Sequence, residues 1–212
     1  MTEVKRRYDA TGRQERARTR RRAVVLAAKE LFERDGFRST TIAAVARQAG
    51  VSAEFVYKGF GTKAVLAKAV FDFAIAGDDE PIPVAERPEA QAVLAEPDVR
   101  RKVELYAAGL ARRQQRSAGV QIMIRDGRHG DETLEGIQQT LLDERLAGMT
   151  MLGRHLLETG QLREGIELDE VRDVLWTYIA VELYELLVLG RGWALDRYAA
   201  WIARAIADAI CR

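Results

Sequence analysis

Apolar residues recur every three or four positions along most of the chain, which is the spacing of a helix with one buried face. Between residues 15 and 35 the buried face is formed by Val24, Ala28, Leu31 and Phe32, and Gly36 follows as a suitable stop. The same spacing predicts eight further helices, at about 41–48, 52–59, 62–76, 98–116, 119–126, 131–159, 169–189 and 196–210. The pattern shows neither strand-like alternation nor a repeat of about 20 to 50 residues, so the predicted fold is all-α with about nine helices.

Hydroxyl and carboxylate side chains precede several of these helices and are suited to cap them. The predicted N-caps are one of the three residues Ser39-Thr40-Thr41 for the second helix, then Ser52, Thr62, Asp131, Asp169 and Asp196. Within the short N-terminal helices, the residues predicted to face the core are Ile42, Val45, Ala46, Val56, Phe60, Val65, Leu66, Ala69, Val70 and Phe73.

The second and third predicted helices are joined by the three residues Ala49-Gly50-Val51, where Gly50 can supply a positive φ. Two short helices joined by a tight turn that contains glycine form a helix-turn-helix, whose second helix fits the major groove of DNA. That second helix is SAEFVYKGF, residues 52–60.

Charge is distributed unevenly along the chain, although the net charge is only +1. Residues 1–63 hold fifteen Lys/Arg and seven Asp/Glu, a net charge of +8, and the remainder holds eighteen and twenty-five, a net charge of −7. A basic N-terminal third attracts the DNA backbone.

Residues 1–14 read as a flexible basic arm, and residues 77–99, with all four prolines and seven acidic residues, read as a surface connection. We therefore expect a DNA-binding domain at 1–76 and a second domain at 77–212.

The residues that other classes of protein require are missing from this sequence. No apolar run is long enough for a membrane span and no signal peptide is evident, so a cytoplasmic location is expected. One cysteine, Cys211, and two separated histidines, His129 and His155, favour neither a disulfide nor a metal site, and we expect no cofactor. Glycine-rich phosphate loops, a nucleophile elbow and paired Glu-x-x-His motifs are missing, so an enzyme is not expected.

An ordered set of residues in the first third resembles the N-terminal domain of the TetR family of transcriptional regulators. The matching positions are Ala27-Ala28, Leu31-Phe32, Gly36-Phe37, Thr40-Thr41, Ala49-Gly50-Val51-Ser52, Tyr57, Phe60 and Lys63. This resemblance implies an all-α homodimer that pairs through its last two helices, binds a palindromic operator and is released from it by a small molecule. It also implies that Tyr57 and Lys63 contact the DNA backbone. Activation of transcription, or binding to DNA without any ligand, stays an alternative, and a protein-binding adaptor would not need the basic N-terminal third.

The predicted DNA-binding residues fall into a group that positions the protein and a group that reads bases. The whole set is Thr41, Ser52, Ala53, Glu54, Phe55, Tyr57, Lys58 and Lys63, with Arg20 to Arg22 as further phosphate contacts. The base-reading group consists of Ala53, Glu54, Phe55 and Lys58, with the gap left by Gly59 as a further candidate. Lys58 can donate to guanine. Glu54 either accepts from cytosine or is a first-turn charge favoured by the helix dipole, and Phe55 either contacts a thymine methyl or packs into the core. The chain departs from the family pattern at Glu54, Phe55 and Gly59.

Ligand-binding candidates lie in the second domain, because helix bundles form pockets from facing aromatic and methionine side chains. They are Tyr106, Met123, Met149, Met151, His155, Trp176, Tyr178 and Glu182. For the aromatic and methionine residues the alternative is ordinary core packing, and for His155 it is a surface or satisfied core position. Glu182 lies on an otherwise apolar helix face, so it should meet an arginine across the dimer or line the pocket.

Overall fold

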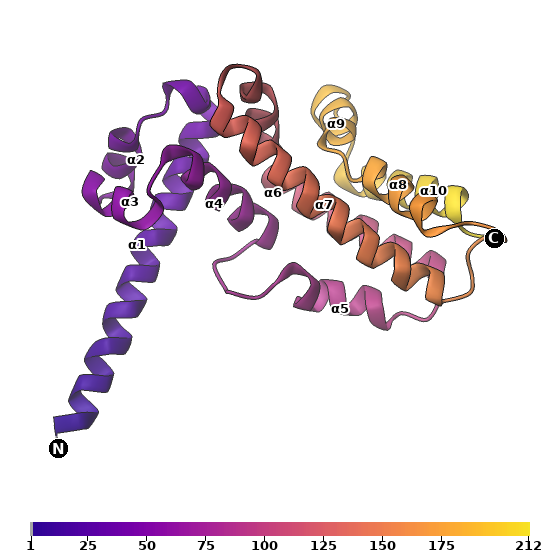
Figure 1. Ribbon diagram of the computed structural model, residues 1–212, viewed down its shortest axis with the longest axis horizontal. Helices are drawn as coiled ribbons and strands as arrows, with labels where there is room; N and C mark the ends of the chain where they lie inside the picture. The colour runs from indigo at the N-terminus through magenta and orange to yellow at the C-terminus, as the bar shows by residue number, and fades with distance from the viewer. Residues whose placement is uncertain (1) are drawn as a thin grey trace.

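The computed structural model describes residues 2–212, with side chains from residue 12 onward, and its described residues are almost entirely helical. Four helices form the N-terminal head: α1 (Thr2–Ser39), α2 (Ile42–Ala49), α3 (Ala53–Phe60) and α4 (Lys63–Ala76). In Figure 1 these helices gather at one end of the molecule, and the first part of α1 projects away from the rest.

The first helix is longer than the sequence pattern predicted. It begins at Thr2, so residues 2–14, which the sequence indicated as a flexible basic arm, belong to α1; Met1 lies outside the described residues. Lys, Arg, Glu, Gln and Ala are good helix formers, and they support a helix here without an apolar face. The helical run is interrupted at Gly36, whose φ of 79° and ψ of 169° turn the chain towards α2, as the sequence predicted.

The N-caps of α3 and α4 are those predicted, and α2 uses Thr41 of the three hydroxyl residues that the sequence offered. The Thr41, Ser52 and Thr62 hydroxyls accept hydrogen bonds from the Ala44, Phe55 and Val65 amides. The predicted core of α1 to α3 is buried, but Val65 is not, because it lies on the solvent side of α4 with 53% of its surface exposed. Ala64 and Ala67 take the buried positions beside Leu66 and Val70 instead.

Six α-helices form the rest of the molecule. They are α5 (Pro88–Ala95), α6 (Val99–Gly127), α7 (Glu132–Glu158), α8 (Leu168–Tyr178), α9 (Val181–Tyr184) and α10 (Leu195–Ile210). Short 3-10 turns lie at Val84–Glu86 and Arg128–Gly130, and a π-helical turn follows α9 at Glu185–Gly190. In Figure 1, α6 and α7 run side by side from the head, with α8 to α10 along one flank and α5 along the other.

Two predicted helix boundaries in this part are wrong. The separate helices expected at 98–116 and 119–126 are one continuous helix, α6. Gly119 does not break it; a Cβ there would lie 2.6 Å from the Glu33 carboxylate, so this glycine allows α1 to approach α6 closely. Conversely, the helix expected at 169–189 is interrupted at Ile179 and Ala180.

Of the three aspartates predicted as N-caps, only Asp131 caps its helix, by accepting from the Thr133 and Leu134 amides. Asp169 and Asp196 lie inside the first turns of α8 and α10, where the positive end of the helix dipole still favours a carboxylate.

The buried apolar residues form two clusters. The first lies between α5, α6, α7, α8, α9 and α10. The second contains the core of α1 to α4, and it also includes Val120 and Ile124 of α6 and Leu134 of α7. The end of α6 is therefore packed into the core of the head.

The C-terminus closes the other end of the molecule, where Leu162 and Cys211 form an isolated antiparallel bridge. Between residues 2 and 212 the chain has no strand beyond this bridge. None of the helices in the described part has the length and apolar character to span a membrane.

Gln114 of α6 supplies hydrogen bonds to the backbone carbonyls at the break between α8 and α9. Its side-chain nitrogen donates to the Ile179 carbonyl at 2.9 Å and to the Ala180 carbonyl at 3.3 Å, and its oxygen accepts from the Tyr198 hydroxyl at 2.7 Å. The side chain is only 2% exposed. It therefore links α6, the interruption and α10 through groups that water does not reach.

We expect Gln114→Leu to lower the free energy of unfolding by about 2 to 4 kcal/mol, because it leaves the Ile179 carbonyl and the Tyr198 hydroxyl buried without a partner. Urea unfolding followed by tryptophan fluorescence measures this, since Trp176, Trp193 and Trp201 all lie outside the head. Gln115→Leu is the matched control, because Gln115 is the exposed neighbour on the same helix. Equal midpoints for the two variants would contradict the structural role of Gln114.

Candidate DNA-binding face and ligand cavity

The exposed face of α3 carries most of the residues that the sequence predicted to bind DNA. Glu54, Tyr57, Lys58 and Gly59 are exposed, and the tyrosine ring shows 56% of its surface. Val56 and Phe60 anchor the opposite face in the core of the head. The helix is thus held by one side and free on the other, as a helix that enters a groove must be.

Arg21 fixes the end of α3. Its guanidinium donates to the Gly59 carbonyl at 2.8 Å and lies 4.1 Å from the centre of the Phe60 ring. The sequence placed Arg21 among possible phosphate contacts; in the structure its exposed guanidinium caps a helix C-terminus, and its contact with DNA stays a prediction. Arg20 and Arg22, its neighbours on α1, are exposed.

Two members of the predicted base-reading group are partly buried. Phe55 and Ala53 pack against the core of the head, so Phe55 adopts the packing alternative that the sequence left open. Glu54 is exposed in the first turn of α3, where the helix dipole stabilises its charge. Lys58 and Tyr57 are the long polar side chains left on the free face.

The other predicted positions lie at helix starts. Thr41 and Ser52 use their hydroxyls as N-caps. The Lys63 ammonium donates to the Phe37 carbonyl at 2.7 Å and to the Thr40 carbonyl at 3.0 Å, and lies 4.2 Å from the centre of the Phe37 ring. Burial lowers the pKa of Lys63, and the Asp131 carboxylate opposes that shift. In this structure Lys63 joins the end of α1 to the start of α4, and its contact with DNA stays a prediction.

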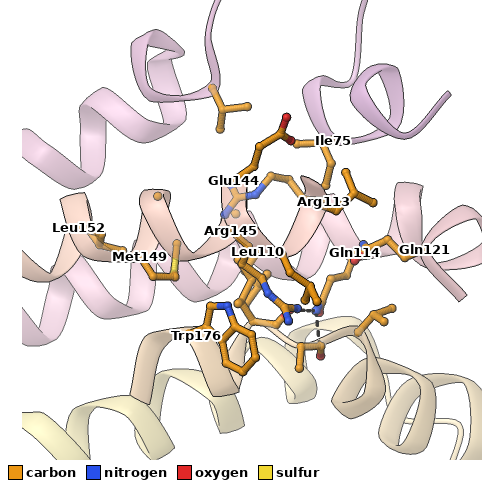
Figure 2. Close-up of a pocket in the computed structure, with 18 of the residues that line it drawn as sticks. Ile75, Leu110, Arg113, Gln114, Gln121, Glu144, Arg145, Met149, Leu152 and Trp176 are labelled. Atoms are coloured by element: carbon orange, nitrogen blue, oxygen red, sulfur yellow. Dashed lines mark hydrogen bonds between the residues drawn. The ribbon is translucent and has the colours of Figure 1, made fainter. Parts of the chain in front are cut away.

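A cavity of about 1240 Å³ lies between α4, α5, α6, α7, α8 and α9. Most of its lining is apolar, and Phe71 and Ile75 of α4 form the part that belongs to the head. Exposed side chains such as Val84 and Met151 also line it, so it opens to solvent. Figure 2 shows side chains from several helices directed into this space.

Five of the predicted ligand-binding residues line the cavity: Tyr106, Met149, Met151, Trp176 and Glu182. The Tyr106 hydroxyl lies 3.2 Å from the Met149 sulfur, and burial raises the pKa of Tyr106 to about 12. Glu182 is not buried as its position suggested; its side chain is half exposed and lies 3.4 Å from Arg125 of the same chain.

The other three candidates do not line it. Met123 packs against the core of the head, and Tyr178 packs edge-on against Trp201 with ring centres 6.0 Å apart. The His155 ring nitrogen Nε2 lies 2.9 Å from the Lys102 ammonium, from which it can accept a hydrogen bond. Buried Lys102 also donates to the Val93 and Leu94 carbonyls of α5, so His155 belongs to a satisfied polar cluster.

Arg145, which was not among the residues predicted from the sequence, extends into the cavity from α7 (Figure 2). Its guanidinium lies 4.5 Å from the centre of the Trp176 ring. Neither Arg145 Nε nor Trp176 Nε1 has a hydrogen-bond partner, although both atoms are buried. Helical spacing could have identified Arg145, because Leu141, Arg145 and Met149 lie four residues apart on one face of α7.

Burial lowers the pKa of Arg145, and the nearby Glu182 carboxylate and Tyr106 hydroxyl oppose the shift. An arginine keeps its proton in proteins, so this shift expresses the cost of holding a charge away from water.

In the described part of the chain, no group of three or more His, Cys, Asp or Glu side chains is arranged to hold a metal ion.

Residues 24–70 match the family described as bacterial regulatory proteins, tetR family. This segment contains the whole of α2 and α3 and most of the buried core of the head. No curated protein is significantly similar to the chain.

Solved structures of TetR-family and fatty-acid regulators share the fold. A putative TetR-family transcriptional regulator from Rhodococcus sp. superposes with a TM-score of 0.71 at 16% identity, over 90% of this chain and 98% of that one. The transcriptional regulator FadR from Bacillus subtilis, in complex with stearoyl-CoA, gives a TM-score of 0.67 at 17% identity, over 87% and 96%. A putative regulator from Saccharomonospora viridis, in complex with choline, gives 0.64 at 17% identity, over 91% and 97%. The chain therefore has the N-terminal domain of the tetR family of bacterial regulatory proteins, on the overall fold of a TetR-family transcriptional regulator.

Proposed function

We propose that the protein is a homodimeric repressor that binds a palindromic DNA operator through α3 and releases it when a small molecule fills the cavity. The observation that carries this proposal is that α4 contributes to both sites. Its Leu66 and Val70 belong to the core that supports α3, while Phe71 and Ile75 line the cavity. A ligand that moves α4 would therefore change the position of α3.

The connection between α4 and α6 supports the same mechanism. Arg116 of α6 donates to the Ala74 carbonyl at 3.1 Å and to the Ile75 carbonyl at 3.2 Å, at the last turn of α4. Arg38, after the turn at Gly36, donates to the Gly130 carbonyl at 2.8 Å, beside the start of α7. A shift of α6 or α7 around a ligand would be transmitted to the head through these bonds. Release then follows if the ligand binds the DNA-incompetent arrangement more tightly.

The division into a DNA-binding domain at 1–76 and an effector domain at 77–212 is part of this proposal. Because Val120, Ile124 and Leu134 pack into the core of the head, the two domains would move as coupled bodies. Movement at one site then has an energetic consequence at the other.

Mobility-shift measurements on the DNA that flanks the protein's own gene test the DNA-binding function. We expect binding there to be much tighter than to scrambled DNA and to weaken as salt rises, because basic side chains displace counterions from phosphate. Equal affinity for both DNAs would exclude a specific regulator and leave the ligand-independent alternative.

Two substitutions on the free face of α3 separate positioning from base reading. Tyr57→Phe should weaken binding to operator and scrambled DNA alike, because its hydroxyl contacts phosphate. Lys58→Ala should cost about 1 to 3 kcal/mol on the operator alone, because it removes a donor to a base edge. If both substitutions reduce affinity equally on both DNAs, Lys58 does not read bases.

Gly59 provides a further test, because the fold does not require glycine there. The residue lies in the exposed part of α3, and a Cβ would meet only the Arg21 guanidinium, at 3.8 Å. We expect Gly59→Ala to stabilise the protein by about 0.5 to 1 kcal/mol, since alanine favours a helix. We also expect about tenfold weaker operator binding, because the methyl group occupies space needed by DNA. Higher stability with unchanged affinity would show that Gly59 does not face DNA.

The proposed dimer uses the segments 169–189 and 196–210. Its support is the exposure of Leu186 and Leu189, which show 63% and 58% of their surface. Two leucines this exposed on one short turn are more readily explained by a partner than by contact with water.

We expect Leu186→Asp combined with Leu189→Asp to give a monomer in analytical ultracentrifugation, because two carboxylates would be buried in an apolar interface. The monomer should also lose most of its operator affinity, since one head contacts only half of a palindrome. Leu146→Asp, at an exposed leucine of α7, is the control and should remain a dimer. A dimeric double variant would place the interface elsewhere.

A further inference from the structure

Some of the positively charged side chains that line the cavity have no carboxylate partner. Four glutamates and four arginines line it. Each glutamate lies within 4 Å of a cationic side chain: Glu89 near Arg112, Glu135 near Arg128, Glu144 near Lys68 and Glu182 near Arg125. Of the arginines, Arg125 and Arg128 take part in these pairs.

The other two arginines, Arg113 and Arg145, take part in none of these pairs. No carboxylate within the described part of the chain forms an ion pair with either of them. Arg113 lies 5.8 Å from the centre of the Tyr106 ring, and Arg145 stacks on Trp176. Both guanidinium groups therefore face aromatic rings. Glu182 shares Arg125 with Asp126 and Glu185, and it is the carboxylate whose charge acts on Arg145, but it forms no ion pair with it.

Arg145 is the more constrained of the two. The buried Nε–H of Arg145 and the buried Nε1–H of Trp176 are donors without an acceptor. The two side chains come from α7 and α8 and are directed into the same part of the cavity (Figure 2). Buried donors are normally satisfied, so these two are unusual. Arg145 as a whole is only partly buried and lines the cavity, so its terminal nitrogens are available to an acceptor that carries negative charge.

The surroundings define the rest of the ligand. Leu110, Met149 and Leu152 line the same cavity, so the part of the ligand beyond its charged group should be apolar. A cationic headgroup would be repelled by Arg145, and a neutral alcohol would leave its charge unpaired. A carboxylate provides two acceptor oxygens and the missing charge, and it forms charge-assisted hydrogen bonds.

We infer that the cavity binds amphipathic carboxylic acids, with the carboxylate held by the terminal nitrogens of the Arg145 guanidinium and the apolar chain along the leucine and methionine side chains. The assignment of these acids as effectors rests on the proposed function, whereas their binding does not. Arg145 is thereby a specificity-determining residue, because it selects the anionic headgroup.

Isothermal titration calorimetry with octanoate, 1-octanol, octylamine and octanoyl-CoA tests the headgroup on the full-length protein. The four probes share an eight-carbon chain, so differences in affinity report on the group at its end. We expect octanoate to bind about 10 to 100 times more tightly than 1-octanol, the range expected for hydrogen bonds to a charged group, and octylamine to bind least. Equal affinity for octanoate and 1-octanol, tighter binding of octanoyl-CoA, or no binding of any probe would overturn the inference.

Arg145→Met removes the charge and keeps the length of the side chain. The variant should bind octanoate and 1-octanol equally, with unchanged affinity for 1-octanol. Its melting temperature without ligand should rise, because a partly buried charge without an ion pair has been replaced by an apolar group. Arg154→Met, at an exposed arginine of the same helix, should keep the preference of the wild type. If Arg145→Met retains the preference for octanoate, another residue holds the carboxylate.

The two proposals fail in different ways. If octanoate binds with the expected preference but does not release the operator, release by the ligand is wrong and the ligand class stands. If octanoate does not bind, and another compound releases the operator, the ligand class is wrong and the regulatory function stands.

Discussion

The burial of Val120 and Ile124 of α6 in the core of the head is the contact on which the rest of the structure depends. Fully burying two such side chains contributes roughly 1.5 to 3 kcal/mol each, so the head and α6 do not separate cheaply. Gly119 allows this packing, because a larger residue would collide with Glu33 of α1. The other end of the same helix packs against α10, and its middle lines the cavity. One helix thus contacts the core that supports α3, the proposed ligand site and the C-terminal helices.

A helix with these contacts transmits movement only if its neighbours resist deformation. Around α6 that resistance comes from polar groups buried with their partners satisfied. Gln114 joins α6 to the break between α8 and α9, and Lys102 holds the end of α5 and the His155 ring. Arg116 holds the end of α4, and burial lowers the pKa of its guanidinium. Each bond joins α6 to the end of another helix, so a displacement of α6 changes the geometry of several elements together.

Helical periodicity predicted the head well, because its helices are short, capped by hydroxyl side chains and buried on one face. The failures come from contacts that a single helix does not reveal. Gly119 looks like a helix break until α1 is seen against it. The interruption at Ile179 and Ala180 has no proline or glycine, and it depends on a distant glutamine that satisfies the freed carbonyls. Val65 was predicted to be buried from its spacing, but alanines occupy the contact instead.

The two candidate sites also differ in how far the sequence could predict them. The free face of α3 could be predicted, since a helix that is buried on one side must expose the other, and Tyr57 and Lys58 follow from that geometry. The cavity could be predicted only in part, because aromatic and methionine residues look the same in a core and in a pocket. Trp176 lines the cavity, whereas Tyr178, two residues later, packs against Trp201.

Arg145 shows what distinguishes a cavity from a core. A core that held this guanidinium would have to supply a carboxylate or lose several kcal/mol, and the sequence gives no sign of which it does. Each lining carboxylate lies within 4 Å of another cation, and Arg145 forms no ion pair in the described part of the chain, so its charge is available to the proposed anionic ligand. An anionic ligand would offset the cost of desolvating this guanidinium, and the same charge would select that ligand. If the ligand-bound form favours a different position of α7 and α6, the free energy of pairing Arg145 is also the free energy available to weaken DNA binding.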